Sequence, residues 1–435
     1  MTLRVLLLTL FLVACGGSNT TSSELEVIGS DTPSSESEAI IYPEDPRPFV
    51  TTWKVDSFGY PDDNQIEIPL IESGYKYDFT VDWGDGSTDE NVTKTISHTY
   101  PSPGTYTVSI SGGFPGWEFP AYSPNNKKLM SIEQWGGIQW RTMKNAFINC
   151  SSLVSNANDQ PNLSLVKDMS GMFADASVFN GDLSYWDVSS ATEMSGMFYD
   201  AREFNGDISN WNTSSVTNMS GMFSSANSFN GDISNWDVSS VKDMSKMFKY
   251  AKAFNADLSN WDVSSVTDMF YMFYLASAFN GDLSNWDVSS VTNMEAMFRE
   301  AIIFNKDLNN WDVSSVTDMT LMFTDAVVFN GNISGWDVSA VKDMSAMFMS
   351  ATAFNGDLRG WNLFEGKSMQ NMFHDAGLST SNYDALLVSW GSQTPARNVH
   401  FNGGNSTCTT VGKAARDTLI NTYNWTFFDR CFKAL

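Results

Sequence analysis

Eight tryptophans set a strict repeat through the middle of the chain. They stand 25 residues apart with no insertion between them, at Trp186, Trp211, Trp236, Trp261, Trp286, Trp311, Trp336 and Trp361. The surrounding phrase recurs as well: FNGDISNWDVSSVKDMSKMF at 229–248 returns as FNADLSNWDVSSVTDMFYMF at 254–273. A fixed period of roughly 20 to 50 residues is typical of stacked repeat arrays. The period therefore predicts that successive coils of the chain stack on one another.

The apolar residues of one coil suggest how it folds. In FNGDLSYWDVSSATEMSGMFYDA, residues 179–201, the first apolar residues have the spacing of a short strand and the later ones fall on one face of a short helix. The strand set is Leu183, Trp186 and Val188, and the helix set is Ala191, Met194, Met197 and Phe198. Since one coil cannot bury these side chains alone, each inward position should form a continuous column. We expect an α+β repeat solenoid with a short strand and a short helix in each 25-residue coil.

Two further columns follow from the period. Eighteen of the 22 methionines belong to the pair M-x-x-M-F, between Met169 and Met372. Core packing explains them better than metal binding, because flexible thioethers fill the space beside stacked aromatic rings. An asparagine recurs from Asn180 to Asn355. It is expected either to hydrogen-bond a neighbouring coil or to take a turn conformation that asparagine tolerates.

The residue after most of the tryptophans is an aspartate that should project outward. Neighbouring unit charges repel by roughly 1 kcal/mol in water, so this column needs solvent, hydrogen bonds from serine or backbone donors, or bound cations. The first two are favoured. Positions near Ala176, such as Asp175, Ser177 and Val178, vary between coils and are either a ligand surface or unconstrained, with the second interpretation favoured. The candidate binding face consists of Asp187, Asp237, Asp262, Asp287, Asp312 and Asp337.

The first residues have the features of an export signal. MTLRVLLLTLFLVAC carries one arginine and an apolar run that is too short to span a bilayer, so residues 1–14 are predicted to be a signal peptide. The letters LVAC at 12–15 resemble a bacterial lipobox, which implies cleavage before Cys15 and its lipidation. The alternative is an ordinary signal peptide with an incidental cysteine. Residues 15–47 are rich in Ser, Thr, Glu and Pro, which predicts a disordered tether.

Residues 48–113 predict a small β-sandwich. Apolar and polar residues alternate within 77–111 around Gly-rich turns, as in short antiparallel strands. WGDGS at 83–87 and HTY at 98–100, with PGTYTV at 103–108, resemble the PKD type of immunoglobulin-like sandwich. His98 is expected to form a hydrogen bond at a strand edge or in the core rather than to act in catalysis.

Three carboxylates surround the Gly-rich turn of this sandwich. Asp82, Asp85 and Asp89 either hydrogen-bond their own backbone or gather a hard cation such as calcium. The first interpretation is favoured, because aspartate in a Gly-rich turn usually bonds its own backbone. We therefore expect neither a metal site nor a cofactor, and keep these three residues as the weak metal candidates.

The repeat phrase also resembles a known family. FNxD[L/I]SxWDVSSVTxMxxMF is similar to the BspA-like leucine-rich-repeat surface proteins, in particular the 25-residue form found in mycoplasma and other bacterial lipoproteins. The resemblance covers residues 169–375, and residues 114–168 are expected to hold an N-terminal cap and a degenerate first coil. It implies a surface-exposed adhesion or binding protein and supplies no catalytic residues.

Residues 376–435 depart from the repeat and are expected to cap the open end of the core. Residues 383–390 and 413–423 look helical, and 398–401 and 425–428 look like strands. In an exported chain, Cys408 and Cys431 are expected to form a disulfide. Cys150 is left as a buried free thiol.

The charge and the residue pattern of the chain argue against two classes of function, nucleic-acid binding and catalysis. The formal net charge is -25, and an acidic surface repels the phosphates of nucleic acid. Glycosidases need two carboxylates in different environments, whereas a periodic column gives every aspartate the same one, so an enzyme is not expected. We expect a lipid-anchored protein of the bacterial cell surface, in the outer membrane if the cell is Gram-negative. Its partner would be an extracellular matrix protein, a glycan or another cell surface, and a structural envelope spacer is the alternative.

Overall fold

The computed structural model describes residues 46–56, 64–363 and 368–431 of the 435-residue chain. The expected signal peptide, the lipidated Cys15 and nearly all of the expected tether lie outside these described residues. All described residues belong to one compact unit, Tyr42–Leu435. Within the described ranges, the helices are all too short or too polar to cross a membrane.

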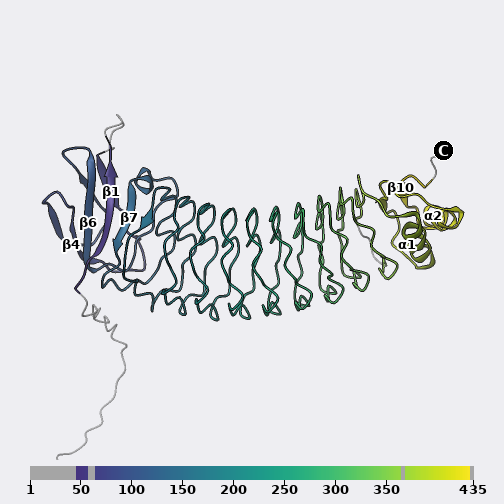
Figure 1. The fold of residues 1–435 in the computed structure, drawn as a ribbon, viewed down its shortest axis with the longest axis horizontal. Helices are drawn as coiled ribbons and strands as arrows, with labels where there is room; N and C mark the ends of the chain where they lie inside the picture. Colours follow the sequence, from purple (N-terminus) through teal and green to yellow (C-terminus); the bar gives the residue numbers. More distant parts are fainter. Residues whose placement is uncertain (1–45, 57–63, 364–367, 432–435) are drawn as a thin grey trace, which may run out of the picture. The chain divides into compact units, whose positions relative to one another are not determined.

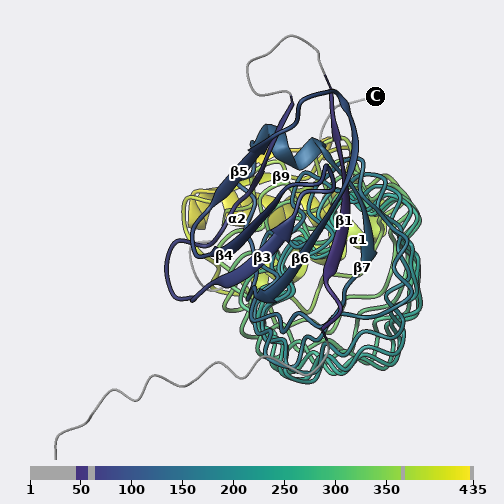
Figure 2. The same cartoon turned by 90° about the vertical axis from the view of Figure 1, so that its left-hand side faces the viewer.

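The first part of the described chain is β-rich. Its elements are β1 (Phe49–Val55), β2 (Gln65–Ile68), β3 (Asp78–Asp82), β4 (Thr88–Val92), β5 (Ile96–Thr99), β6 (Gly104–Gly113), the 3-10 helix η1 (Pro124–Lys127), β7 (Leu129–Gln134) and β8 (Val154–Ser155). One sheet has the order β4-β3-β6-β1-β7-β8, and Figure 2 shows its strands from β4 to β7 side by side. Strand β2 pairs with β5 in a second sheet. The pairs from β1 to β6 are antiparallel, as the alternating pattern predicted.

The larger sheet continues past residue 113, the expected end of the sandwich. Strand β1 pairs with β6 on one side and with β7 on the other, so that Thr51 lies opposite both Val108 and Ile132. Strand β8 then joins β7 in parallel, and the bridge between Gln139 and Asn162 follows it. The sheet therefore leads directly into the coils.

The described residues between β8 and α1 form 25-residue coils that contain turns and isolated bridges (Figure 1). Each bridge is parallel and joins residues one period apart, for example Glu193 to Asn218 and Asn218 to Asp243. The short strand expected at 183–188 and the short helix expected at 191–198 are both absent from these described coils. The prediction of a strand and a helix in each coil was wrong.

The backbone of the M-x-x-M-F segment explains this difference. The amides of Met194, Gly196, Phe198 and Asp200 donate to carbonyl oxygens of the next coil at 2.8–3.1 Å, and those of Met197 and Tyr199 donate to carbonyl oxygens three residues earlier. Gly196 has φ 58° and Asp200 has φ 51°. A helix or a strand requires a run of right-handed or extended residues, so left-handed residues four positions apart exclude both.

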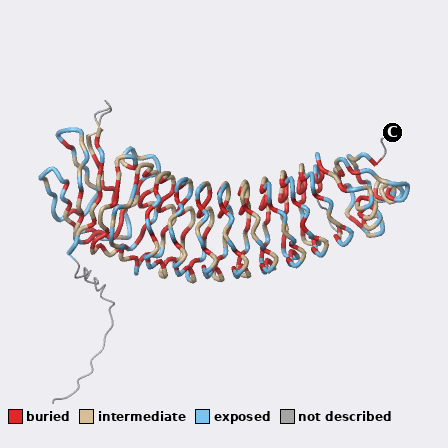
Figure 3. The backbone as a smooth tube through the Cα atoms, viewed as in Figure 1, coloured by how far each residue is buried: buried red, intermediate tan, exposed pale blue. Residues whose placement is uncertain are grey.

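Aromatic columns fill the interior of the coils. From Trp211 to Trp361, every repeat tryptophan donates its indole N–H to a carbonyl oxygen 28 residues earlier, at 2.8–3.3 Å. The rings of Trp261 and Trp286 stack with centroids 6.4 Å apart. The paired methionines are fully buried, which confirms their predicted place in the core. Figure 3 shows these buried residues recurring in every coil.

The asparagine column bonds neighbouring coils, which was one of its two predicted roles. The backbone amide of Asn205 donates to Asn180 Oδ1 at 2.8 Å, and the same bond recurs in each following coil as far as Asn355. Asn355 Oδ1 then accepts from the amide of Ser379, the N-cap residue of the first α-helix. The column therefore joins the coils to the C-terminal cap.

The cap has the elements that the sequence predicted. These are α1 (Thr380–Ser392), β9 (His400–Asn402), α2 (Thr410–Tyr423) and β10 (Thr426–Phe428). A parallel bridge between Met369 and Phe401 continues the coil ladder into the cap. Cys408 and Cys431 form the predicted disulfide, with Cα atoms 4.6 Å apart. Cys150 is a buried free thiol, and burial raises its pKa.

Replacing Trp286 should measure what one indole contributes to the array. Trp286 is 2% exposed and donates to the Leu258 carbonyl oxygen at 2.9 Å. Trp286→Ala should lower the free energy of unfolding by about 3–5 kcal/mol through the cavity it leaves. Trp286→Phe keeps a ring but loses the hydrogen bond, and should cost about 1–2 kcal/mol.

Urea unfolding followed by circular dichroism measures both changes. Tyr185→Ala is the control, because Tyr185 is 80% exposed and its loss should leave the midpoint unchanged. Equal midpoints for Trp286→Ala and Tyr185→Ala would contradict the role given to the column.

Candidate binding surface on the coils

The three weak metal candidates of the β-rich region each have a separate partner. Asp82 Oδ1 accepts from the amide of Gly84 at 2.9 Å, and Asp89 Oδ2 accepts from the Trp83 indole at 2.8 Å. Asp85 accepts from the amide of Ser87 at 3.0 Å. In the described part of the chain, no group of three or more His, Cys, Asp or Glu side chains is arranged to hold a metal ion. The contacts of Asp82 and Asp85 agree with the favoured interpretation, in which an aspartate bonds the backbone of its own turn, whereas Asp89 accepts from a side chain.

His98 helps to close that turn. Its ring stacks on Trp83 with centroids 4.8 Å apart, and its Nε2 lies 2.8 Å from Asp85 Oδ2. Hydrogen bonds from the Ser87 hydroxyl and from His98 lower the pKa of Asp85 to about 2. These contacts fix a β5 residue against the β3–β4 turn, which fits the strand-edge role expected for His98.

The outward aspartate column consists of local turns. Asp187, Asp237, Asp262, Asp287, Asp312 and Asp337 are exposed, and each Oδ1 accepts from the amide of the serine two residues later at 2.9–3.1 Å. Hydrogen bonds from the serine side chain and amide lower the pKa of Asp187, Asp237, Asp287 and Asp312. Each aspartate bonds the serine two residues later in its own coil, so the chemical environment of the column is the same in every one of these coils.

A second and a third polar column repeat this arrangement. Asp182 Oδ1 accepts from the amide of Ser184, two residues later, at 2.9 Å. Glu193 Oε1 accepts from the amide of Ser195 at 2.9 Å, so this residue caps a turn and not the helix that was expected. In the third column, burial raises the pKa of Asp268.

The variable positions of the coils lie around the two methionines. They are the two residues after the first methionine and the two residues after the phenylalanine of M-x-x-M-F. In the coil that begins at Met219 they are Ser220, Gly221, Ser224 and Ser225. In the coils that begin at Met244, Met269 and Met294 they include aromatic and basic residues instead. We define the aromatic–cationic patch as Lys246, Lys249, Tyr250, Phe270, Tyr271, Tyr274 and Arg299.

The side chains of the patch contact one another across three coils. Lys249 Nζ lies 5.3, 5.4 and 5.7 Å from the ring centroids of Tyr250, Tyr271 and Tyr274. Lys246 Nζ lies 5.2 Å from the Phe270 ring. On the other side, the Arg299 guanidinium is 5.2 Å from the Tyr274 ring. These are cation–π distances, so the rings hold the cations in place.

The rings also contact each other, and they remain partly exposed. The Tyr250 hydroxyl donates to the Tyr274 hydroxyl at 3.4 Å, and the Phe270 and Tyr271 centroids are 4.1 Å apart. The hydrogen bond with Tyr250 and burial raise the pKa of Tyr274. Arg299 pairs with Glu300 at 3.5 Å, whereas Lys246 and Lys249 form no ion pair with a described carboxylate.

Backbone conformation makes the patch side chains costly. Lys246, Tyr250 and Tyr271 have φ 58–60°, where a non-glycine residue costs roughly 1–2 kcal/mol. In earlier coils, Gly196 and Gly221 occupy the position of Lys246 and Tyr271, and Ser225 occupies that of Tyr250. Sequence reasoning noted that these positions vary, since Tyr250 corresponds to Asp175, but it did not identify the patch. The sequence feature that could have identified the patch is the replacement of Ser-Gly, found in earlier coils, by bulky residues in consecutive coils.

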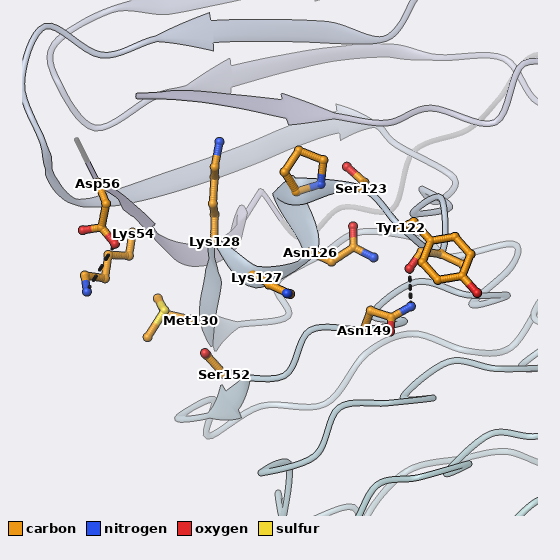
Figure 4. Close-up of a pocket in the computed structure, with 12 residues that line it drawn as sticks. Lys54, Asp56, Tyr122, Ser123, Asn126, Lys127, Lys128, Met130, Asn149 and Ser152 are labelled. Carbon is orange, nitrogen blue, oxygen red and sulfur yellow. Dashed lines mark hydrogen bonds and ion pairs between the residues drawn. The ribbon is translucent and has the colours of Figure 1, made fainter. Parts of the chain in front are cut away.

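Two hollows of the described part of the chain lie away from the patch. One of about 730 Å³ is lined by Lys54, Tyr122, Lys127 and Lys128, near the start of the coils (Figure 4). Lys128 Nζ donates to the Gln65 carbonyl oxygen at 2.7 Å, and Lys54 pairs with Asp56 at 3.5 Å. Lys128 and Lys54, two of the three lysines that line this hollow, therefore already bond to other groups of the protein. A smaller hollow of about 270 Å³ lies at the cap and is lined by residues that include Gln370, His400 and Phe428.

Comparison with known families finds two matches. The family described as "Mycoplasma protein of unknown function, DUF285" matches four overlapping segments, 121–215, 141–239, 206–301 and 281–386. Together they span more than half of the 435 residues. A PKD domain matches residues 64–113, which confirms the PKD resemblance. No curated protein and no solved structure matches the chain.

Replacing aspartates of the outward column by asparagine tests their turn role. Asn212 occupies this column naturally and accepts from the Ser214 amide at 3.2 Å, so Asp237→Asn, Asp287→Asn and Asp312→Asn should fold. The folded pKa of each carboxyl lies below its ordinary value of 3.8. Its contribution to stability is therefore present above that value and lost as the pH falls through the folded pKa.

The parent should consequently lose more stability than the triple variant between about pH 6 and about pH 2.5. Urea midpoints at the two pH values measure the difference. An identical loss in both proteins would show that these carboxyls contribute nothing as charged turn acceptors.

Proposed function

The chain belongs to the family described as "Mycoplasma protein of unknown function, DUF285", and from this premise we propose that it is a surface-exposed, non-catalytic bacterial protein that binds an extracellular partner. The partner is a matrix protein, a glycan or another cell surface. In this proposal the coils form a BspA-like leucine-rich-repeat solenoid. The regular coil-to-coil hydrogen bonds and the 25-residue period support that assignment.

The aromatic–cationic patch carries the proposal. A repeat array with the same core in every coil gives most of its surface the same chemistry, so recognition must come from coils that differ. The patch is confined to three consecutive coils, and the coils before it carry Ser and Gly at several of the same positions. Tyrosine and arginine are also the residues most enriched in binding hot spots. We therefore assign the binding function to this patch.

The proposal excludes acid–base catalysis by the aspartate columns. A general acid and a general base need carboxyls whose environments push their pKa values apart. Asp187, Asp237, Asp287 and Asp312 instead share one kind of serine partner and one direction of pKa shift. A non-catalytic role is the simpler account of such columns.

Anchoring at the membrane is the second part of the proposal. Lipidated Cys15 would hold the protein on the outer face of a membrane, with the tether and the β-rich region lifting the coils from it. In a Gram-negative cell this membrane is the outer one. The acidic charge of -25 supports a partner other than nucleic acid.

Substituting the lipidated cysteine tests the anchor. Cys15→Ser removes the thiol that would carry the acyl chain, so the protein should move from the detergent phase to the aqueous phase in Triton X-114 partitioning. Unchanged partitioning would overturn the lipid-anchor proposal and leave the binding proposal in place.

The alternative function is a structural spacer of the cell envelope. It is favoured by the asparagine ladder, which repeats without interruption from Asn180 to Asn355 and ties the coils into one continuous element. A structural spacer requires this continuity, and its function does not depend on the aromatic–cationic patch.

A pair of deletions separates the two functions. Removing residues 229–278 takes out two whole coils and six of the seven patch residues, whereas removing residues 304–353 takes out two whole coils and none of the patch. Both deletions begin at the same point of the phrase and keep the period, so both proteins should fold.

Adhesion of protein-coated beads to extracellular matrix and to epithelial cells measures the outcome. The 229–278 deletion should abolish adhesion, and the 304–353 deletion should leave it close to that of the parent. Equal adhesion by the parent and both shortened proteins would reject the binding proposal and favour the spacer.

A further inference from the structure

We propose that the aromatic–cationic patch binds an acidic polysaccharide, a glycan that carries carboxylate or sulfate groups. This inference rests on the proposed binding function and adds the chemical class of the ligand. The contacts of Lys249, Lys246 and the three tyrosines carry it, together with the backbone hydrogen bonds beneath them.

The charges of the patch select an anion. The chain as a whole has a formal charge of -25, which repels anionic ligands from most of its surface. Lys249 is held by three tyrosine rings and Lys246 by Phe270, and neither forms an ion pair with a described carboxylate. An ammonium group held by ring faces keeps its charge and its N–H donors. An anion can therefore bind here without displacing a carboxylate.

The carboxylates near the patch indicate which of its cations would bind the anionic group of the ligand. Arg299 pairs with Glu300 at 3.5 Å, so its charge is already partly balanced. Glu295 lies in the same coil as Arg299, and its carbonyl oxygen accepts from the amide of Tyr271 at 2.9 Å. Asp268 interacts electrostatically with Lys246, so the charge of Lys246 is also partly balanced. The least compensated positive charge is thus at Lys249, which contacts the carboxylate or sulfate group with Lys246 beside it.

The tyrosines fit a sugar. A pyranose ring has apolar C–H faces and polar hydroxyl groups at its edge, and a half-exposed tyrosine offers an apolar ring and a polar hydroxyl together. Tyr250 and Tyr274 place their hydroxyl oxygens 3.4 Å apart, and Tyr271 packs against Tyr274 with centroids 5.1 Å apart. The patch therefore supplies stacking faces and hydrogen-bonding groups beside the two ammonium groups.

The backbone of the patch disfavours an acidic peptide, the other anionic polymer. Extended peptides commonly bind by adding a strand to an unpaired sheet edge. Here the amides of Lys246, Tyr250 and Tyr271 already donate to carbonyl oxygens of the next coil at 2.7–2.9 Å. Recognition must then come from side chains alone, which suits a glycan.

The open position of the patch indicates a polymer and not a small metabolite. Its residues line neither of the two hollows described above. They extend over three coils that are spaced by roughly 5 Å, as hydrogen-bonded chains are. A polysaccharide chain that crosses the coils would contact all of them.

Binding of defined polymers to the full-length protein tests this proposal. The probes are heparin, which is sulfated, hyaluronan, which is carboxylated, neutral dextran, and poly-glutamate as an acidic peptide. Biolayer interferometry should detect heparin or hyaluronan and neither dextran nor poly-glutamate. Which of the two acidic glycans binds more tightly identifies the anionic group.

Four variants distinguish a built site from general attraction. Lys249→Ser, Tyr271→Gly and Tyr274→Ser each introduce the residue found at the same position of the coil that begins at Met219, so each should fold. Each should weaken acidic-glycan binding by about tenfold, the tyrosine variants without any change in charge. Lys342→Ser removes a lysine outside the patch and should change binding less than about twofold.

Three results would overturn the ligand class. The first is equal binding of poly-glutamate and heparin, and the second is folded tyrosine variants that bind acidic glycan like the parent. The third is no binding of either acidic glycan. If the 229–278 deletion still abolishes bead adhesion in that case, only the ligand class is wrong; if adhesion is also unchanged, the proposed function fails with it.

Discussion

From Trp211 to Trp361, the hydrogen bond from the indole N–H of each repeat tryptophan to a carbonyl oxygen of the preceding coil ties this structure to its period. The Trp286 indole reaches Leu258, and the Trp311 indole reaches Leu283. An unpaired buried donor costs about 1–3 kcal/mol, so a coil that lost its register would lose this bond together with its ring stacking. The asparagine ladder imposes the same register at a second point of the coil. The chain can therefore change its surface freely, but not the length or the core of a coil.

The columns could be predicted from the sequence because the residue types that favour burial and the 25-residue spacing can both be identified in it. The tryptophan, methionine and asparagine positions, the cap helices and the Cys408–Cys431 disulfide all followed from spacing and residue type. The conformation within a coil could not, because residues such as Lys246 and Tyr271 adopt a left-handed backbone that their identity disfavours. The apolar spacing at 183–198 suits a strand and a helix, but tertiary hydrogen bonds between coils decide the backbone.

The binding patch was hidden for a different reason. Its residues lie in three coils, and the contacts of Lys249 with Tyr271 and Tyr274 exist only once the coils stack in register. From the sequence alone, variation at these positions fits either a ligand surface or unconstrained solvent-exposed residues, and the second interpretation is the favoured one. The aspartate columns were easier to notice because they repeat, and for that reason they distinguish no coil from another. In this protein the departures from the repeat point to recognition, whereas the repeat itself supplies the scaffold.

Moving the patch along the array tests this division most directly. A variant without the patch at its natural place would receive six of the seven patch side chains, all but that of Arg299, three coils later. The substitutions are Leu321→Lys, Thr324→Lys, Asp325→Tyr, Ser345→Phe, Ala346→Tyr and Met349→Tyr. Bead adhesion of the folded variant is the measurement. The account predicts that adhesion returns, because every coil offers the same scaffold. A folded variant that displays the moved patch and does not adhere would contradict it.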